Sequence, residues 1–225
     1  MPHQLTLVII TIVATALVAL IVILRNPKSE ITQSFAVLIS CFVLWAAAQG
    51  VMYVSMDVRL AYTADVLAFF TALCIAWAFL RFAFLFPSRM FPVRKDVIAT
   101  LGMASLLIIS LILVPGFMIR DIQVWNPGFG FPVNTVQFLV YTTIFFSVFG
   151  YAYLILARKY FVSTAENKVL LLHVIYASLI PVTAGSILNL LLLAVNQLRY
   201  QIYGPSFTLF FTLTVAYLIF IRRER

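Results

Sequence analysis

The chain has 225 residues, of which 64% are hydrophobic and 10% are charged, and its mean hydropathy is +1.10. This composition excludes a soluble globular domain and indicates an integral membrane protein. The net charge of +8 would suggest a nucleic-acid partner for a soluble chain. Here, however, every Lys lies in a predicted connection and almost every Arg at the end of an apolar run, so the charge indicates membrane topology and no nucleic-acid binding.

Uninterrupted apolar runs of about 20 residues, the length that crosses a bilayer core as a helix, exclude a β-barrel and predict an all-α integral membrane bundle. We expect a single domain, residues 1–225, with seven transmembrane helices at about 5–24, 32–54, 60–86, 97–115, 134–157, 169–195 and 205–221. The first run lacks the basic start of a signal peptide, so it is expected to remain as a helix.

The longest connection, at about 116–133, contains the turn sequence Asn126-Pro127-Gly128 between two β-prone segments. It predicts a small outer hairpin that caps the bundle. The sequence contains no visible internal repeat, which disfavours a transporter built from two inverted halves.

Lys and Arg are divided unevenly between the two sets of connections. Only Arg59, Arg120 and Arg199 lie in one set. Eleven basic residues lie in the other set: Arg25, Lys28, Arg89, Arg94, Lys95, Arg158, Lys159, Lys168, Arg222, Arg223 and Arg225. Because basic residues concentrate in cytoplasmic loops, the split predicts an N-terminus outside and a C-terminus in the cytoplasm.

Polar side chains gather in the outer halves of four spans under this topology. We expect six of them to line a ligand pocket that opens to the outside or to the outer leaflet: Gln49, Tyr53, Asp65, Gln137, Tyr141 and Asn189. The same residue types also form interhelical hydrogen bonds, each worth about 1 kcal/mol, which is the alternative interpretation. Asp65, a lone carboxylate near the membrane surface, either has a partner or is hydrated among the headgroups.

Two pairs of residues are candidate flexing points for signalling. Pro181 removes a backbone donor inside the sixth span and Gly185 follows one turn later, while Gly204 and Pro205 precede the seventh span. Membrane helices also tolerate such residues without a signalling role. Arg81 lies about one turn from the cytoplasmic end of the third span, from which its side chain is expected to reach the interface.

No cofactor, metal site or catalytic residue is predicted. The last span contains no Lys that could form a retinal Schiff base, and the two histidines, His3 and His173, lie near opposite ends of the membrane, which excludes a shared haem. The sequence also lacks a phosphate loop and the Cys/His spacing of a zinc site. An intramembrane enzyme, the remaining catalytic alternative, would have to rely on Asp65.

Several short segments follow one another in a characteristic order. They are Asn26-Pro27-Lys28, Phe82-Ala83-Phe84-Leu85-Phe86-Pro87, Glu166-Asn167-Lys168, Gly204-Pro205, Phe207-Thr208-Leu209-Phe210 and Ala216-Tyr217-Leu218-Ile219. Together with the number and order of spans, they resemble the N-terminal seven-helix sensor region of bacterial histidine kinases over essentially the whole chain. The resemblance implies a sensory input module in a bacterial inner membrane, usually a homodimer, whose last helix continues into a cytoplasmic kinase or another output domain.

The expected function is therefore that of a sensor in a two-component signalling system, which detects a small ligand or a membrane state and transmits a change through its last helix. The chain lacks the phosphoacceptor helices and the ATP-binding domain, so we expect no kinase activity from it; it is either an excised sensor or one that signals through a separate partner. The alternative is a small transporter or channel subunit. Polar groups become sparse towards the inner ends of the spans, which favours a blind pocket over a conduit. The aromatic surroundings suit a small apolar or amphiphilic ligand.

Overall fold

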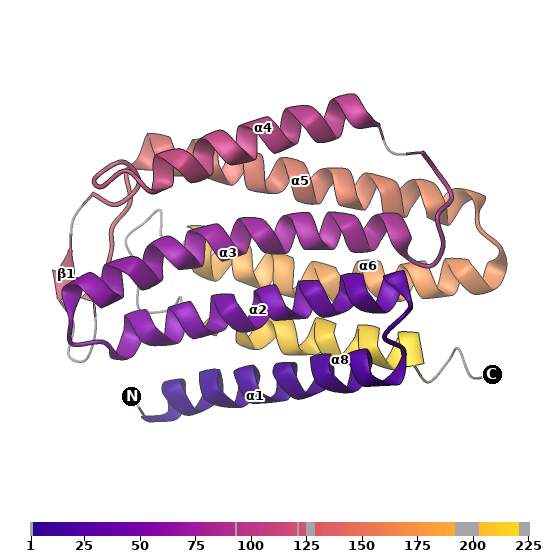
Figure 1. The fold of residues 1–225 in the computed structure, drawn as a ribbon, viewed down its shortest axis with the longest axis horizontal. Helices are drawn as coiled ribbons and strands as arrows, with labels where there is room; N and C mark the ends of the chain where they lie inside the picture. Colours follow the sequence, from indigo (N-terminus) through magenta and orange to yellow (C-terminus); the bar gives the residue numbers. More distant parts are fainter. Residues whose placement is uncertain (1, 93, 121, 125–128, 192–202, 221–225) are drawn as a thin grey trace.

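The computed structural model describes residues 2–92, 94–120, 122–124, 129–191 and 203–220 (Figure 1). It consists of helices α1 (Pro2–Arg25), α2 (Glu30–Val54), α3 (Val58–Leu85), α4 (Lys95–Ile112), α5 (Thr135–Val162), α6 (Ala165–Ser186) and α8 (Ser206–Phe220), with a π-helix, η1 (Ile187–Leu191), directly after α6. The expected all-helical class is confirmed.

Within the described residues, six helices are long and apolar enough to cross a membrane: α1, α2, α3, α4, α5 and the continuous helix formed by α6 and η1. The helix α8 is apolar but shorter, with 15 residues. These helices are consistent with a multi-pass membrane protein. The end of the expected sixth span at 192–195, Arg199 and the terminal residues Arg222, Arg223 and Arg225 lie outside the described residues.

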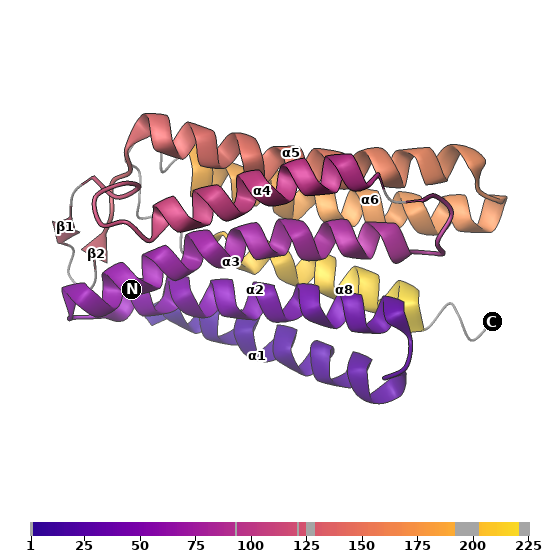
Figure 2. The ribbon, with the colours of Figure 1, turned by 45° about the horizontal axis from the view of Figure 1, so that its top comes forward.

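Successive helices run in alternating directions, so the connections divide between two ends of the bundle (Figures 1 and 2). The connections that follow α1, α3 and α5 lie at one end, together with the end of α8; we call this the basic end because Arg25, Lys28, Arg89 and Arg94 lie there. The connections that follow α2 and α4 lie at the opposite end, which we call the hairpin end.

The helices form a closed ring. Neighbours in the ring are α1, α2, α3, α5, α6 and α8, and α8 contacts α1 to complete it. The helix α4 lies outside the ring against α3 and α5. It is held to α3 where the indole Nε1 of Trp77 donates a hydrogen bond to Ser105 Oγ at 3.0 Å, and where the indole packs beside Gly102.

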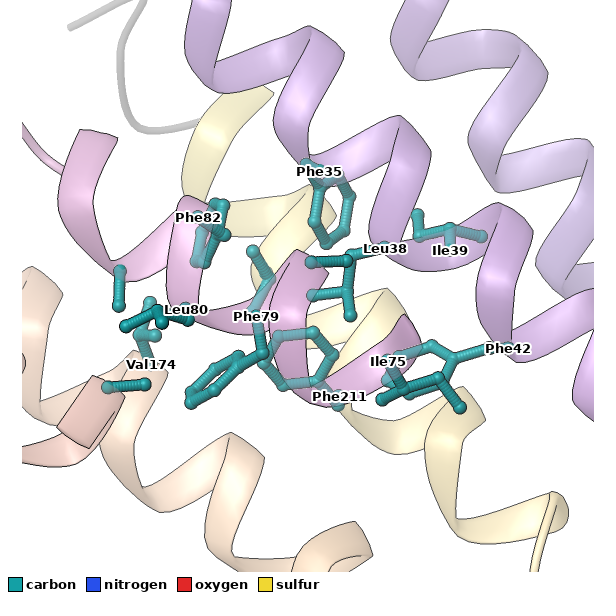
Figure 3. Close-up of a cluster of buried hydrophobic side chains, with 14 of the residues drawn as sticks. Phe35, Leu38, Ile39, Phe42, Ile75, Phe79, Leu80, Phe82, Val174 and Phe211 are labelled. Atoms are coloured by element: carbon teal, nitrogen blue, oxygen red, sulfur yellow. The ribbon is translucent and has the colours of Figure 1, made fainter. Parts of the chain in front are cut away.

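Apolar side chains fill the interior of the ring near the basic end (Figure 3). Phe35 on α2, Phe82 on α3 and Phe211 on α8 are buried. The ring centroid of Phe35 lies 5.8 Å from that of Phe82 and 6.3 Å from that of Phe211. Rings at these separations pack favourably in tilted or edge-to-face arrangements, so the three helices are joined by a continuous aromatic cluster.

The hairpin end is covered by the connection between α4 and α5. Strands β1 (Gln123–Val124) and β2 (Phe129–Gly130) pair in antiparallel fashion, in the segment where the sequence indicates a hairpin. The turn residues 125–128 lie outside the described residues. Phe129 and Phe131 pack against Met52 and its neighbours at the adjoining ends of α2 and α3. The connection therefore covers the end of the ring.

The expectation that Lys159 lies in a connection is wrong. The helix α5 continues to Val162, and Lys159 occupies its last turns with only 1% of its surface exposed. Its Nζ donates hydrogen bonds to the carbonyl oxygens of Phe84 at 2.6 Å, Phe86 at 2.9 Å and Ser88 at 2.7 Å. The final carbonyls of a helix lack partners within the helix, so this ammonium group caps the C-terminal end of α3.

Candidate functional site

A cavity lies inside the ring, towards the hairpin end. It offers about 90 Å³ to the centres of water-sized molecules, whereas one water needs about 10–15 Å³ on that scale, so it has room for several waters or a small organic molecule. Every helix of the ring except α1 contributes to its lining, and so does η1. The lining includes Phe42, Trp45, Gln49, Asp65, Phe69, Phe79, Tyr141, Phe145, Phe149, Ser178, Pro181, Gly185, Asn189, Thr208 and Phe211.

Aromatic rings form most of the wall on the side of α3 and α5. On α5, the centroids of Phe145 and Phe149 are 4.9 Å apart, and Tyr141 stacks on Phe145 at 6.3 Å. Phe149 stacks on Phe79 of α3 at 5.3 Å, and Phe79 meets Phe211 of α8 at 6.1 Å. The wall of the cavity is therefore continuous with the aromatic cluster at the basic end.

Three buried polar atoms in the lining lack hydrogen-bond partners in the described structure. They are Oε1 of Gln49 on α2, Oδ2 of Asp65 on α3 and Oδ1 of Asn189 on η1. Gln49 and Asp65 are each only 5% exposed. An unpaired buried polar group costs about 1–3 kcal/mol, and proteins usually pair such groups. Of the seven buried side-chain oxygens without a partner in the described part of the chain, these three lie together in one cavity.

Other polar groups of the lining already have partners. The hydroxyl of Tyr141 donates a hydrogen bond to the carbonyl oxygen of Phe69 at 2.9 Å. The hydroxyl of Tyr153 donates to Ser178 Oγ at 3.0 Å, and Ser178 Oγ donates to the carbonyl oxygen of Ile175 at 2.9 Å. These groups hold α5 against α3 and α6, and their hydrogen-bonding capacity is largely used.

Asn189 reaches the cavity through an irregular helix. Pro181 has no N–H, so the carbonyl of Ala177 loses its usual donor, and the helix passes from α to π geometry at Ile187. A π-helical turn is wider than an α-helical turn and often occurs at functional sites. Nδ2 of Asn189 donates to the carbonyl oxygen of Gly185 at 3.3 Å, while Oδ1 has no partner in the described part of the chain.

The start of α8 touches the same asparagine. Gly204 is buried directly against Asn189, and a methyl group at position 204 would overlap its side-chain amide. The next residue, Pro205, accepts a hydrogen bond at 2.6 Å from the hydroxyl of Thr208, a residue of the lining. A movement of Asn189 therefore bears directly on the beginning of α8.

The structure brings together four of the six residues expected in the pocket, Gln49, Asp65, Tyr141 and Asn189. It separates the other two. Tyr53 is buried beside Val8 of α1, and Gln137 is half-buried on α5 outside the lining. Both lie one turn closer to the hairpin end than a lining residue on the same helix, so the expected set of pocket residues extends too far towards the hairpin end.

Sequence reasoning missed most of the aromatic wall. Tyr141, Phe145 and Phe149 recur every four residues along α5, which places them on one face, yet the same spacing is also common in an apolar core. Phe211 was not predicted as a lining residue, because large apolar residues occur on every side of α8 and its sequence distinguishes no single face.

No group of three or more His, Cys, Asp or Glu side chains that could hold a metal ion is found in the described ranges. No protein-family model matches the sequence, and no curated protein is significantly similar to it. The cavity's geometry is therefore the basis for assigning a function.

Proposed function

We propose that the chain is a membrane-embedded sensory input module that binds a small amphiphilic ligand in the cavity and passes a conformational change to α8. The carrying observation is the convergence of Gln49 Oε1, Asp65 Oδ2 and Asn189 Oδ1, all lacking described partners, on an aromatic space. The amide oxygens of Gln49 and Asn189 can only accept, so they favour a ligand that donates hydrogen bonds. The matching ligand has an apolar body and one or more O–H or N–H groups.

The contacts of α8 support the signalling half of this proposal. Phe211 and Thr208 line the cavity, and Gly204 contacts Asn189. A ligand that prefers one arrangement of these residues shifts the equilibrium between two positions of α8. Phe211 also contacts Phe35 and Phe42 of α2, so displacement of α8 is transmitted to the core near the basic end.

The proposed topology has seven spans, with α8 as the seventh, an N-terminus outside and a C-terminus in the cytoplasm of a bacterial cell. The concentration of basic side chains at one end of the bundle supports this orientation. The resemblance to histidine-kinase sensor regions adds the proposed partners, which are a second copy of the chain and a cytoplasmic kinase or other output domain.

A transporter or channel subunit is less well supported. A transport path would continue from the cavity to the basic end, where Phe35, Leu38, Leu80 and Phe82 instead fill the interior (Figure 3). Each is no more than 2% exposed. The cavity is closed on this side, as a blind binding pocket requires.

The test uses 1-octanol, which has an apolar body and one donor, and its isomer dibutyl ether, which has no donor. Trp45 lines the cavity and reports binding by fluorescence once Trp77 and Trp125 are replaced by Phe. We expect saturable quenching by octanol, but not by the ether. Asp65→Leu should weaken octanol binding about tenfold, because the ligand's hydroxyl then loses one of its polar partners in the cavity.

The matched control is Asp57→Asn. Asp57 caps the first turn of α3, where Oδ1 accepts a hydrogen bond from the Arg59 amide at 2.8 Å, and Asn caps a helix equally well. Equal effects of the two substitutions, or equal binding of octanol and the ether, would refute the binding site.

The signalling half is tested by a distance measurement. Spin labels at Leu24 of α1 and Tyr217 of α8, both exposed, report the separation of these helices near the basic end after Cys41 and Cys74 are replaced by Ser. We expect saturating octanol to shift the distance distribution. Saturable binding with an unchanged distribution would leave a binding site but exclude a sensor that acts through α8.

A further inference from the structure

A second cavity lies between α3 and α4, near the basic end. It offers about 540 Å³ to the centres of water-sized molecules, and Trp77, Leu80, Phe84 and Ile98 supply apolar walls. Arg81 and Arg89 also line it. We call this space the α3–α4 groove. No residue of the ligand cavity described above belongs to it.

The position of α4 explains why the groove exists. The helix approaches α3 at Trp77, where the indole donates to Ser105 and packs beside Gly102. Towards the basic end the two helices lie further apart, as both views show (Figures 1 and 2). Along the chain, the lining of the groove therefore runs from Trp77 to Arg81 on α3 and on to Arg89 in the connection at the basic end.

Arg81 differs from the other arginines near this groove. Arg89 forms an ion pair with Glu30 at 2.6 Å, and Arg94 forms one with Asp96 at 2.6 Å. The exposed side chain of Arg81 has no acidic partner among the described residues, although it belongs to a helix long and apolar enough to span a membrane. Reaching towards water, as expected from the sequence, relieves the cost of burying the charge but provides no counter-charge.

We propose that the α3–α4 groove binds one anionic phospholipid, with the lipid phosphate at Arg81 and an acyl chain along Trp77, Leu80 and Ile98. Arg89 uses one terminal nitrogen for Glu30, and its remaining N–H donors are available to the same headgroup. A guanidinium group matches phosphate geometry, and basic pockets between membrane helices favour anionic headgroups. The proposal rests on membrane insertion and does not depend on the sensor function.

The experiment counts bound lipids by native mass spectrometry of the purified full chain. Phosphatidylglycerol is compared with phosphatidylcholine carrying the same acyl chains, each titrated into detergent-solubilised protein. We expect one phosphatidylglycerol to be retained with at least about fivefold preference, the effect of one nearby basic side chain at a lipid surface. Equal retention of the two lipids would overturn the proposal.

Three variants locate the site. Arg81→Gln should lower phosphatidylglycerol retention about fivefold, and Arg81→Lys, which keeps the charge but not the planar guanidinium, should lower it by a smaller factor. Ile98→Trp keeps every charge but fills the groove, so it should also reduce retention. The control is Arg158→Gln, an exposed arginine near the basic end that lies outside the groove lining; it should leave retention unchanged.

Two further outcomes would contradict the proposal. An equal loss in Arg158→Gln would show general attraction to a basic surface rather than a defined site. Effective competition by glycerol 3-phosphate, which has the phosphate but no acyl chains, would show an anion site that does not use the apolar walls. If Arg81→Gln fails to fold, retention in Ile98→Trp still decides the matter, because normal retention in a filled groove would exclude this location.

Discussion

Asp65 and Lys159 are the two most informative ionisable side chains inside the bundle, and their surroundings are opposite. Lys159 lies near the basic end, where its Nζ donates to three carbonyl oxygens at the end of α3. Asp65 lies in the half nearer the hairpin end, where its Oδ2 has no partner in the described structure and faces a cavity. Both side chains are buried, so burial does not distinguish them. Their hydrogen bonds do, because those of Lys159 join two helices, whereas Oδ2 of Asp65 is unpaired in the described structure.

The same contrast extends to packing. Near the basic end, aromatic rings from α2, α3 and α8 fill the ring of helices (Figure 3). In the other half, the aromatic rings of α5 and α3 line the cavity, and residues of the π-helix η1, which follows α6, also line it. Ligand-binding regions are commonly drawn from the less tightly packed parts of a fold. We therefore expect substitutions near the basic end to change stability alone, and substitutions of the unpaired polar residues around the cavity to change binding as well.

The largest predicted effect is that of Lys159→Met. The substitution leaves three carbonyl oxygens at the end of α3 without their shared donor, and hydrogen bonds to charged groups contribute about 1.5–3 kcal/mol each without adding fully. We expect the free energy of unfolding to fall by about 3 kcal/mol, measured by titration from mixed micelles into sodium dodecyl sulfate. Octanol binding per folded molecule should remain unchanged.

The neighbouring Arg158→Met serves as its control. Arg158 is exposed on the same helix turn, so its replacement should change the free energy of unfolding by no more than about 0.5 kcal/mol. Similar losses in the two variants would mean that the three hydrogen bonds of Lys159 contribute little, and the contrast with Asp65 would disappear.

A smaller effect is predicted at the contact between η1 and α8. In Gly204→Ala the added methyl group overlaps the Asn189 amide, and overpacking of this kind costs about 1–3 kcal/mol. In an Asn189→Ala background the same substitution should cost less than about 0.5 kcal/mol. The coupling is measured by a double-mutant cycle of unfolding free energies.

Gly150 supplies the comparison for this cycle. A methyl group at Gly150 of α5 meets nothing within 4 Å, so Gly150→Ala should be neutral or stabilising by about 0.5–1 kcal/mol through helix propensity. A cost of Gly204→Ala that persists in the Asn189→Ala background would show that α8 and η1 are not coupled through this contact.

A third prediction concerns the cost of an unpaired polar atom in the cavity to the free energy of unfolding. Gln49→Leu removes an orphaned acceptor, and we expect it to raise the free energy of unfolding by about 1 kcal/mol while weakening octanol binding. Gln33→Leu on the same helix is the control, since Gln33 is exposed and its Nε2 donates to the carbonyl oxygen of Pro27 at 2.9 Å. Loss of stability in Gln49→Leu would indicate that Gln49 is already satisfied within the fold.

The membrane class and the order of the helices follow from apolar length and charge, which need no tertiary information. The limits of α5 do not, because nothing local indicates that Lys159 finds three acceptors on another helix and so permits the helix to continue to Val162. A basic residue near the end of an apolar run is equally suited to a loop. The position of Lys159 depends on hydrogen bonds to residues more than 70 positions away in the sequence.

The candidate site was accessible from the sequence only in part. The gathering of polar side chains in the outer halves of the second and fifth spans identified Gln49 and Tyr141. The depth of each residue along its helix was harder to predict. One turn of a helix face can line a cavity while the next turn on the same face lies outside it, as Tyr53 and Gln137 show. Whether a polar atom is paired depends on neighbouring helices, so the orphaned acceptors could not be identified without the fold.

The smallest predicted effect distinguishes a wall from a ligand contact. Tyr141 was expected to bind the ligand, yet its hydroxyl donates to the Phe69 carbonyl oxygen at 2.9 Å. Tyr141→Phe should therefore lower the free energy of unfolding by about 0.6–1 kcal/mol and leave octanol affinity within twofold. Tyr62→Phe, at a half-buried ring beside Phe131, is the control. A large loss of octanol affinity in Tyr141→Phe alone would show that this hydroxyl leaves the carbonyl to bind the ligand, and that hydrogen bonds within the fold do not separate structural from functional groups in this cavity.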